Sequence, residues 1–158
     1  MFRFSQDARK FFNRIGVSAS QQKGKSTSGQ FQTMFDAFWL CCQLGMKRGP
    51  DGYRKSEKQQ PEITPRFVGG SKTHRDLISG VGFYYHCSRK GFTDVNDQVL
   101  VEMEKFFSEV PGELGSSGYD LFNAYSNGGF EILYESMGDH TEELSEFLSE
   151  YVELMGYS

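Results

Sequence analysis

Histidine and cysteine are the first side chains to consider for chemistry, because both bind metal ions and both serve in nucleophilic catalysis. The chain contains His74, His86, His140, Cys41, Cys42 and Cys87. The histidines lack the HxxxH and HxxE spacings of metal sites, and the adjacent Cys41 and Cys42 cannot form a CxxC clamp. His86 and Cys87 point to different faces of a predicted helix. We therefore predict no metal site and no cofactor, and interpret each histidine as a core or surface residue.

A glycine-rich stretch at residues 69–73 superficially resembles a phosphate-binding loop. Such a loop follows the pattern GxxxxGK[ST], in which a lysine comes directly after the last glycine. Here Pro65 stands where the first glycine is needed, and Ser71 separates Gly70 from Lys72. The start of the following helix could still bind an anion, as any helix N-terminus can. The stretch therefore gives little support to nucleotide hydrolysis.

Other catalytic patterns are missing as well. Neither GxSxG nor a cysteine and histidine signature is present. Neighbouring acids such as Glu102 and Glu104 stand at a spacing that is typical of the solvated face of an amphipathic helix. We predict a protein that is not an enzyme. A small-molecule enzyme with a deep pocket stays open as an alternative.

Residues 47–75 are rich in basic side chains and lack helical periodicity. They contain three of the four prolines, and eight Lys or Arg against three acids. Long loops in a compact domain tend to be functional. We predict a long basic loop over residues 47–72 in which these side chains contact DNA or RNA: Arg48, Arg54, Lys55, Lys58, Arg66 and Lys72. Tyr53 and Phe67 are available to stack on bases. The alternative is a solvated loop whose charges maintain solubility.

Charge is divided unevenly between the two halves of the chain. Residues 1–79 hold 14 Lys and Arg against 6 Asp and Glu, or +8, whereas residues 80–158 hold 3 against 15, or −12. Such a division can draw the halves together in one fold, pair chains head to tail, or leave a basic face for an anionic partner. The acidic helix predicted near the C-terminus either docks on a basic partner or serves as a solubilising face.

The candidate side chains must be positioned by helices. The most apolar helix is predicted over residues 31–46. Its sequence, FQTMFDAFWLCCQLGM, is hydrophobic almost all round, which is typical of a buried helix. It is too short to be interpreted as a membrane span. We interpret it as the central core helix, with a helix that awaits a partner chain as the alternative.

Five further segments show apolar side chains at helical spacing. They are residues 5–15, about 73–90, 94–110, 119–137 and 141–155. Asn127, Gly128 and Gly129 predict a kink or a break in the fourth of these. Gly80 and Gly82 in the second predict close packing against a neighbour. The chain is thus predicted to be all-α, a compact bundle of about six helices in a single domain over residues 1–158, with a flexible loop at 18–30.

The compartment is predicted to be the cytoplasm. Three cysteines, two of them adjacent, do not form the paired framework of a secreted protein. No stretch approaches the length of a transmembrane helix, and the first residues lack the apolar core of a signal peptide. We expect a protein that does not bind membranes.

Two segments together resemble a known group of proteins. Residues 3–16, RFSQDARKFFNRIG, and residues 35–49, FDAFWLCCQLGMKRG, are similar to small helical accessory proteins of bacterial DNA phosphorothioation and related phage-defence clusters. In those proteins a basic, serine-capped helix precedes a hydrophobic helix that ends in a Leu-Gly turn. The resemblance covers about 45 residues, and the chain departs from it by the loop at 18–30 and by its acidic C-terminal half.

The resemblance implies a subunit without enzymatic activity that associates with DNA or with a complex. We accordingly expect a small subunit or adaptor of a bacterial, nucleic-acid-related complex, with the basic loop contacting DNA or RNA. Its partner would be a larger protein subunit or a second copy of the chain. The alternative is a protein-binding module that does not contact nucleic acid.

Overall fold

The computed structural model of the chain describes residues 1–15, 33–55, 60–63, 72–110 and 113–156. The helices in these ranges are α1 (Gln6–Arg14), α2 (Met34–Lys47), α3 (Lys72–Arg89), α4 (Asp97–Phe106), α5 (Ser116–Met137) and α6 (Leu144–Leu154). A 3-10 helix, η1 (Gly49–Gly52), follows α2, and strands β1 (Phe2–Arg3) and β2 (Glu62–Ile63) form one antiparallel pair. The predicted all-α class is therefore confirmed. The two-residue strands were not predicted, because they are too short to show an alternating pattern.

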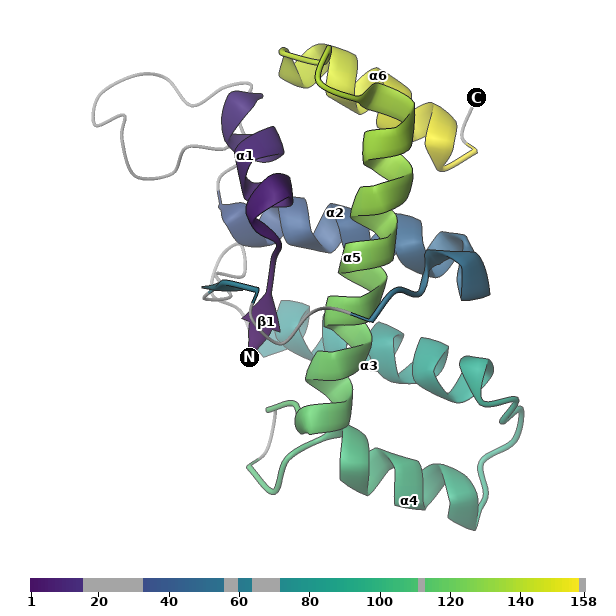
Figure 1. Cartoon of the computed structure of the whole chain (residues 1–158). Coiled ribbons are helices and arrows are strands. Elements are labelled where there is room, and N and C mark those ends of the chain that lie inside the picture. Colours follow the sequence, from purple (N-terminus) through teal and green to yellow (C-terminus); the bar gives the residue numbers. More distant parts are fainter. Residues whose placement is uncertain (16–32, 56–59, 64–71, 111–112, 157–158) are drawn as a thin grey trace.

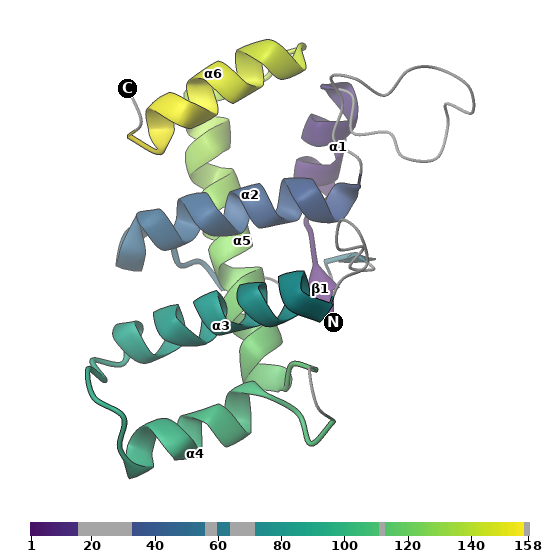
Figure 2. The ribbon, with the colours of Figure 1, turned by 180° about the vertical axis from the view of Figure 1, so that it is seen from behind.

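Helix α5 runs through the length of the molecule, and α2, α3 and α4 cross it one after another (Figures 1 and 2). Near the C-terminal end of α5, α6 lies across it and α1 lies beside it. Helix α2 is buried in the middle of this arrangement, with Phe38, Cys41 and Leu44 excluded from solvent. The interpretation of residues 31–46 as the central core helix is confirmed for the part that the structure describes, where the helix begins at Met34 and ends at Lys47. Phe31 and the predicted loop at 18–30 lie outside the described residues.

Aromatic rings fill most of the core. Phe2 of β1 contacts Phe35 and Phe38 of α2, each at 5.3 Å between ring centroids, and also Phe122 of α5 at 5.9 Å. Phe12 of α1 contacts Phe147 of α6 at 5.4 Å. Edge-to-face pairs of this kind add to the free energy gained from burying the rings. They join the N-terminal residues to α2, α5 and α6.

The predicted break at residues 127–129 is wrong, because α5 is one continuous helix from Ser116 to Met137. The glycines serve a different purpose: they let backbones approach closely. A Cβ added at Gly129 would collide with the carbonyl oxygen of Cys41 in α2, and one added at Gly128 would collide with that of Gly52 in η1. Gly82 also packs closely, against Phe122, as predicted, whereas Gly80 has open space around it.

Helix α4 differs from its prediction. Apolar side chains at helical spacing predict a helix over residues 94–110 with one buried side; they are Val95, Val99, Leu100, Met103, Phe106, Phe107 and Val110. The helix ends at Phe106, and Val95, Leu100, Met103 and Val110 are exposed. It lies at the edge of the molecule, and among the described elements it packs mainly against α3 and α5, where Glu102 and Phe106 are buried.

The helix starts agree with the sequence only in part. Ser5, the first residue of the range predicted for α1, is its N-cap, and its Oγ accepts the N–H of Ala8 at 3.1 Å. Helix α4 is capped by Asn96 and begins at Asp97, three residues after the start of its predicted range. Helix α6 begins at Leu144 and not at Thr141, whose carbonyl oxygen instead accepts a hydrogen bond from the Nε of Arg14.

Ion pairs join the basic front half to the acidic back half of the chain. Arg14 and Asp139 are 3.0 Å apart, and Arg54 and Glu131 are 3.3 Å apart. Of the three arrangements that the charge division allows, attraction between the halves of one fold is therefore observed. Among the described residues, no helix is both long and apolar enough to span a bilayer.

Candidate functional site

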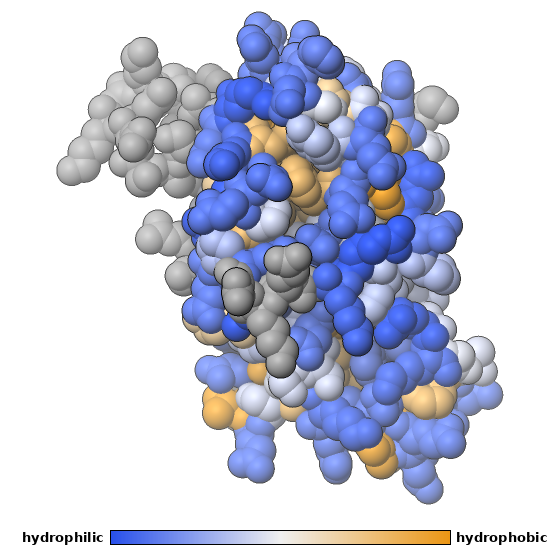
Figure 3. Space-filling view, in the orientation of Figure 1, coloured by the Kyte–Doolittle hydropathy of each residue, from blue (hydrophilic) through white to orange (hydrophobic). Residues whose placement is uncertain are grey.

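A groove between α1 and α5 combines aromatic and charged side chains, and it has a volume of about 480 Å³. Its floor is made by Phe11, Phe130 and Tyr134. The space-filling view shows apolar atoms between hydrophilic surroundings in this region (Figure 3). We call this feature the α1–α5 groove.

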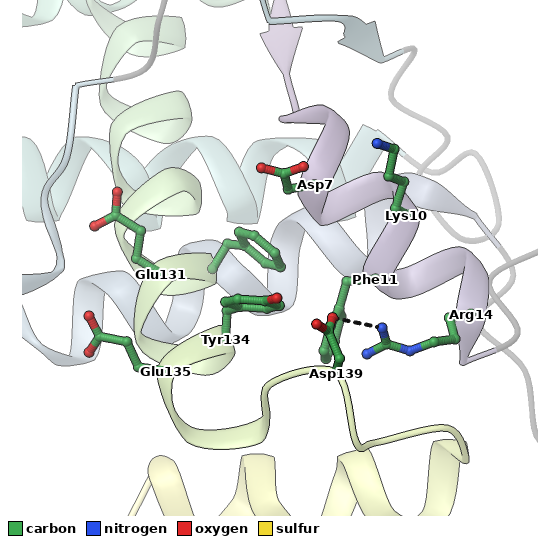
Figure 4. Close-up of a pocket in the computed structure, with 9 residues that line it drawn as sticks. Asp7, Lys10, Phe11, Arg14, Glu131, Tyr134, Glu135 and Asp139 are labelled. Carbon is green, nitrogen blue, oxygen red and sulfur yellow. Dashed lines mark hydrogen bonds and ion pairs between the residues drawn. The ribbon is translucent and has the colours of Figure 1, made fainter.

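Helical spacing places the side chains of the groove. Phe130 and Tyr134 are four residues apart on α5, and so are Glu131 and Glu135, so each pair occupies one line along the helix. Tyr134 points from α5 toward α1, while the two glutamates line the outer side of α5 (Figure 4). The groove therefore has an aromatic floor and an acidic rim along α5.

The rim contributed by α1 is mixed in charge, with Asp7, Lys10 and Arg14. The three rings of the floor contact one another: the Phe11 centroid is 5.8 Å from that of Phe130 and 6.3 Å from that of Tyr134. Phe11 is 2 % exposed, whereas Tyr134 is 40 % exposed. Tyr134 is therefore the ring of the floor that a ligand can reach most easily.

Arg14 closes one end of the groove. Its Nη1 donates to Asp139 Oδ1 at 3.0 Å, and its Nη2 donates to the carbonyl oxygen of Gly138 at 3.2 Å. The guanidinium carbon lies 5.1 Å from the centroid of the Phe11 ring. A cation of the chain itself thus already rests on the aromatic floor and is held by a carboxylate.

Two groups at this end have shifted pKa values. The hydrogen bond from the Tyr134 hydroxyl to Asp139 raises the pKa of the tyrosine, because the neutral phenol is the donor. The Arg14 guanidinium, followed by the Tyr134 hydroxyl, holds the pKa of Asp139 below its ordinary value. Near neutral pH the phenol keeps its proton and the carboxyl stays ionised. Both shifts move the pKa values further from neutral pH, where a general acid or base works best.

The charges in the groove do not cancel. Four carboxylates line it, against the two cations Lys10 and Arg14. Two carboxylates have cationic partners, since Arg14 contacts Asp139 and Arg54 contacts Glu131. Aromatic faces and carboxylates both attract ammonium and guanidinium groups. The arrangement suits a cationic ligand.

Three of the predicted nucleic-acid contacts are described, and none of the three lines the α1–α5 groove. Arg48 follows α2 and donates from Nη2 to the carbonyl oxygen of Leu154 at the end of α6, at 3.2 Å. Arg54 pairs with Glu131. Lys55 is exposed and lines a different groove, of about 510 Å³, together with Arg3, Tyr53 and Tyr119.

The other predicted contacts are not described. Lys58 and Arg66 lie outside the described residues, and so does the predicted stacking residue Phe67. Lys72 is the first residue of α3, and its side chain is likewise outside them. The prediction that these six residues form one nucleic-acid site therefore stays a prediction, because the structure describes the side chains of only three of them.

A buried cluster between α3 and α4 was also missed by the sequence analysis. Glu102 was interpreted as part of a solvated face, but it is 7 % exposed. Its Oε2 lies 2.8 Å from His86 Nε2 and 2.7 Å from Lys90 Nζ, and its Oε1 lies 3.4 Å from Lys105 Nζ. Hydrogen bonds from Lys90 and His86 lower the pKa of Glu102 to about 2. A carboxylate held so firmly in its ionised form is a poor general base, so we interpret the cluster as a tie between the two helices.

The cysteines are also unsuited to catalysis. Cys41 and Cys42 are fully buried, and burial raises the pKa of both thiols. Burial also raises the pKa of Cys87. Thiolates are therefore not favoured near neutral pH. Within the described ranges, no group of three or more His, Cys, Asp or Glu side chains could hold a metal ion.

The sequence contains one signal that could have located the α1–α5 groove. Two pairs, Phe130 with Tyr134 and Glu131 with Glu135, repeat at a spacing of four on the same helix. On a helix, this spacing places the two acidic side chains next to the two aromatic side chains, which can be recognised from the sequence. What the sequence does not show is that α1 lies opposite these two lines.

Comparisons with known proteins give no further guidance: no family model, curated protein or solved structure matches the chain. The resemblance to accessory proteins of DNA phosphorothioation clusters therefore stays a prediction.

Proposed function

We propose that the protein is a binding module without enzymatic activity, whose α1–α5 groove receives a Lys- or Arg-rich segment of a partner protein. The observation that carries this proposal is the position of Arg14, whose guanidinium lies over Phe11 and pairs with Asp139. The groove thus already combines the two interactions that a partner's basic side chain would need.

The rest of the groove offers the same interactions to an incoming cation. Tyr134 is an exposed ring beside Glu135, and Asp7 extends the acidic lining on α1. A cation on an aromatic face gains roughly 0.5 to 2 kcal/mol, depending on how far it is desolvated. Several weak contacts of this kind along a groove are typical of peptide recognition by charge and aromatic stacking. This supports the alternative in which the chain binds protein rather than nucleic acid.

The experiment measures binding of a labelled peptide of alternating Gly and Arg by fluorescence anisotropy. We expect saturable binding, and the same peptide with Glu in place of Arg should not bind. Tyr134→Ala should weaken binding about tenfold, because it removes the ring that contacts the cation. A tenfold loss corresponds to about 1.4 kcal/mol of binding free energy. Tyr84→Ala removes a ring of α3 that is 67 % exposed and lies outside the groove, so it is the matched control.

A second pair of variants tests the charge of the rim. Glu135→Gln keeps the size of the side chain and removes its charge, so it should weaken binding about threefold, as expected for an exposed ion pair. Glu153→Gln on α6, also exposed, should leave the affinity unchanged. Equal losses in the two variants would show that the peptide senses only the net charge of the molecule, which contradicts the proposal. Equally tight binding of spermidine would identify the groove as a small-cation site instead.

One observation favours the nucleic-acid function as a second candidate. The groove that contains Lys55 also contains Arg3 and two tyrosines, which is a combination that can hold phosphate and stack on bases. Against it, the guanidinium of Arg89 already lies 3.8 Å from the centroid of the Tyr53 ring.

In this second candidate, the chain would act as a DNA- or RNA-contacting subunit of a bacterial defence complex, as the resemblance implies. Titration with labelled single-stranded and duplex DNA at low salt tests it. Binding should fall steeply as salt rises and should weaken with Lys55→Ala, but not with the control Lys10→Ala on α1. No binding to either form of DNA, or equal losses in the two variants, would remove this candidate.

A further inference from the structure

The exposed side of α4 forms a second groove, with a volume of about 680 Å³. We call it the α4 groove; its lining is Leu100, Met103, Glu104, Phe107, Ser108 and Glu109. Leu100 is 51 % exposed and Met103 is 46 % exposed. Apolar side chains gathered at one exposed hollow often mark an interaction site.

The apolar lining is distinct from the side of α4 that packs on the protein. Glu102 and Phe106 are buried between α4 and its neighbours α3 and α5. Leu100 and Met103 are three positions apart in α4, so they share a different side of the helix, and Phe107, the partly buried residue that follows α4, adds its ring to the lining. This side has apolar residues at helical spacing but is left open by the described part of the chain.

Charge indicates what kind of partner fits the α4 groove. Glu104 and Glu109 are exposed carboxylates in its lining, and no Lys or Arg stands among the described residues that line it. The neighbouring Lys105 directs its Nζ to Glu102, on the inner side of α4. A second copy of this chain placed symmetrically on the groove would bring carboxylates against carboxylates.

We propose that the α4 groove is a docking site for a basic amphipathic helix of a different protein. Apolar side chains of that helix would contact Leu100, Met103 and Phe107, and its Lys or Arg side chains would pair with Glu104 and Glu109. Recognition of this kind uses the same pattern as other helix-in-groove interfaces. The α4 groove is a separate site from the α1–α5 groove, because its ligand needs apolar side chains in addition to cations. Helices α4 and α1 lie near opposite ends of α5 (Figure 1).

The test uses a labelled synthetic helical peptide of Leu and Lys, with Leu at spacings of three and four. We expect saturable binding with one peptide per chain, and no binding of the same peptide with Glu in place of Lys. Leu100→Ser and Met103→Ser should each weaken binding about tenfold, because each removes apolar surface that the peptide covers. Both side chains are about half exposed, so the variants keep the fold.

Val101→Ser is the matched control. Val101 is 48 % exposed on the same helix but does not line the α4 groove, so its replacement should change the affinity less than about twofold. An equal loss with Val101→Ser would overturn the proposal, as would equally tight binding of the Leu and Glu peptide. A dimer of the free protein that Leu100→Ser dissociates would also overturn it, because the occupant would then be a second copy.

Discussion

Glu102 is a carboxylate that the fold nearly removes from water while surrounding it with His86, Lys90 and Lys105. Replacing it with Gln keeps the volume but leaves these groups without their anion. We expect Glu102→Gln to lower the free energy of unfolding by about 2 kcal/mol at pH 7, the scale of a hydrogen bond to a charged group. Urea unfolding measures this. The control Glu104→Gln, on the exposed side of the same helix, should change stability by less than about 0.5 kcal/mol.

The carboxylate of Glu102 should also make the free energy of unfolding depend on pH. In the folded state the pKa of Glu102 is lowered from 4.5 to about 2. A lowered pKa means that the unfolded chain binds the proton first, so the stabilisation is complete above about pH 4.5 and is lost as the pH falls toward 2. Urea midpoints measured across this window should fall more steeply for the unmodified protein than for Glu102→Gln. Parallel curves would show that Glu102 is not stabilised as an anion.

At the scale of elements, the crossing of α2 and α5 depends on glycine. Alanine normally favours a helix over glycine by about 1 kcal/mol. At Gly129 the added methyl group would collide with the carbonyl oxygen of Cys41, so the helices would have to separate. We expect Gly129→Ala to destabilise the protein by about 2 kcal/mol, as other overpacked sites do. Thermal or urea unfolding measures the change.

Gly80 provides the matched comparison for this crossing. It is also inside a helix, α3, but it is exposed and nothing lies within 4 Å of an added Cβ. Gly80→Ala should therefore stabilise the protein by about 0.5 to 1 kcal/mol through helix propensity and a less flexible unfolded chain. Opposite signs for the two substitutions are the expected result. Stabilisation by both would mean that α2 and α5 do not approach as closely as the structure shows.

At the scale of the whole molecule, the sequence predicted what depends on periodicity. The all-α class and the approximate bounds of the helices follow from apolar spacing, and the core helix α2 follows from its nearly uniform hydrophobicity. The continuity of α5 did not follow, because a Gly-Gly pair in a sequence does not reveal the backbone that lies against it. The exposure of Leu100 and Met103 could not be predicted from the sequence either. Periodicity shows that one side of a helix is apolar, but not whether another element covers that side.

The Glu102 cluster and the α1–α5 groove could not be predicted for a related reason. Glu102 looks like any helical glutamate until His86 of α3 and Lys90, the residue after α3, are brought beside it. The floor of the α1–α5 groove needs Phe11 and Tyr134, which are 123 positions apart in the sequence. Contacts between residues so far apart in the sequence depend on how the helices pack. A single sequence shows the two residues but not that they are in contact.

Helices α1 and α4 lie near opposite ends of α5 (Figure 1), and each lines one of the two grooves, which gives a prediction for the molecule as an adaptor. They share no lining residue, and their ligands differ, since one needs only cations and the other also needs apolar anchors. We expect the Gly and Arg peptide and the Leu and Lys peptide to bind at the same time, each changing the affinity of the other by less than about twofold. Anisotropy of one labelled peptide, measured with the other at saturation, tests this.

Variants assign each peptide to its groove. Tyr134→Ala should weaken only the Gly and Arg peptide, and Leu100→Ser only the Leu and Lys peptide. Competition between the peptides, or loss of both in either variant, would mean that one acidic surface binds every cation, and the adaptor function would then fail. Independent binding would mean that a single chain can hold two different basic partners together, because α5 keeps the two grooves apart.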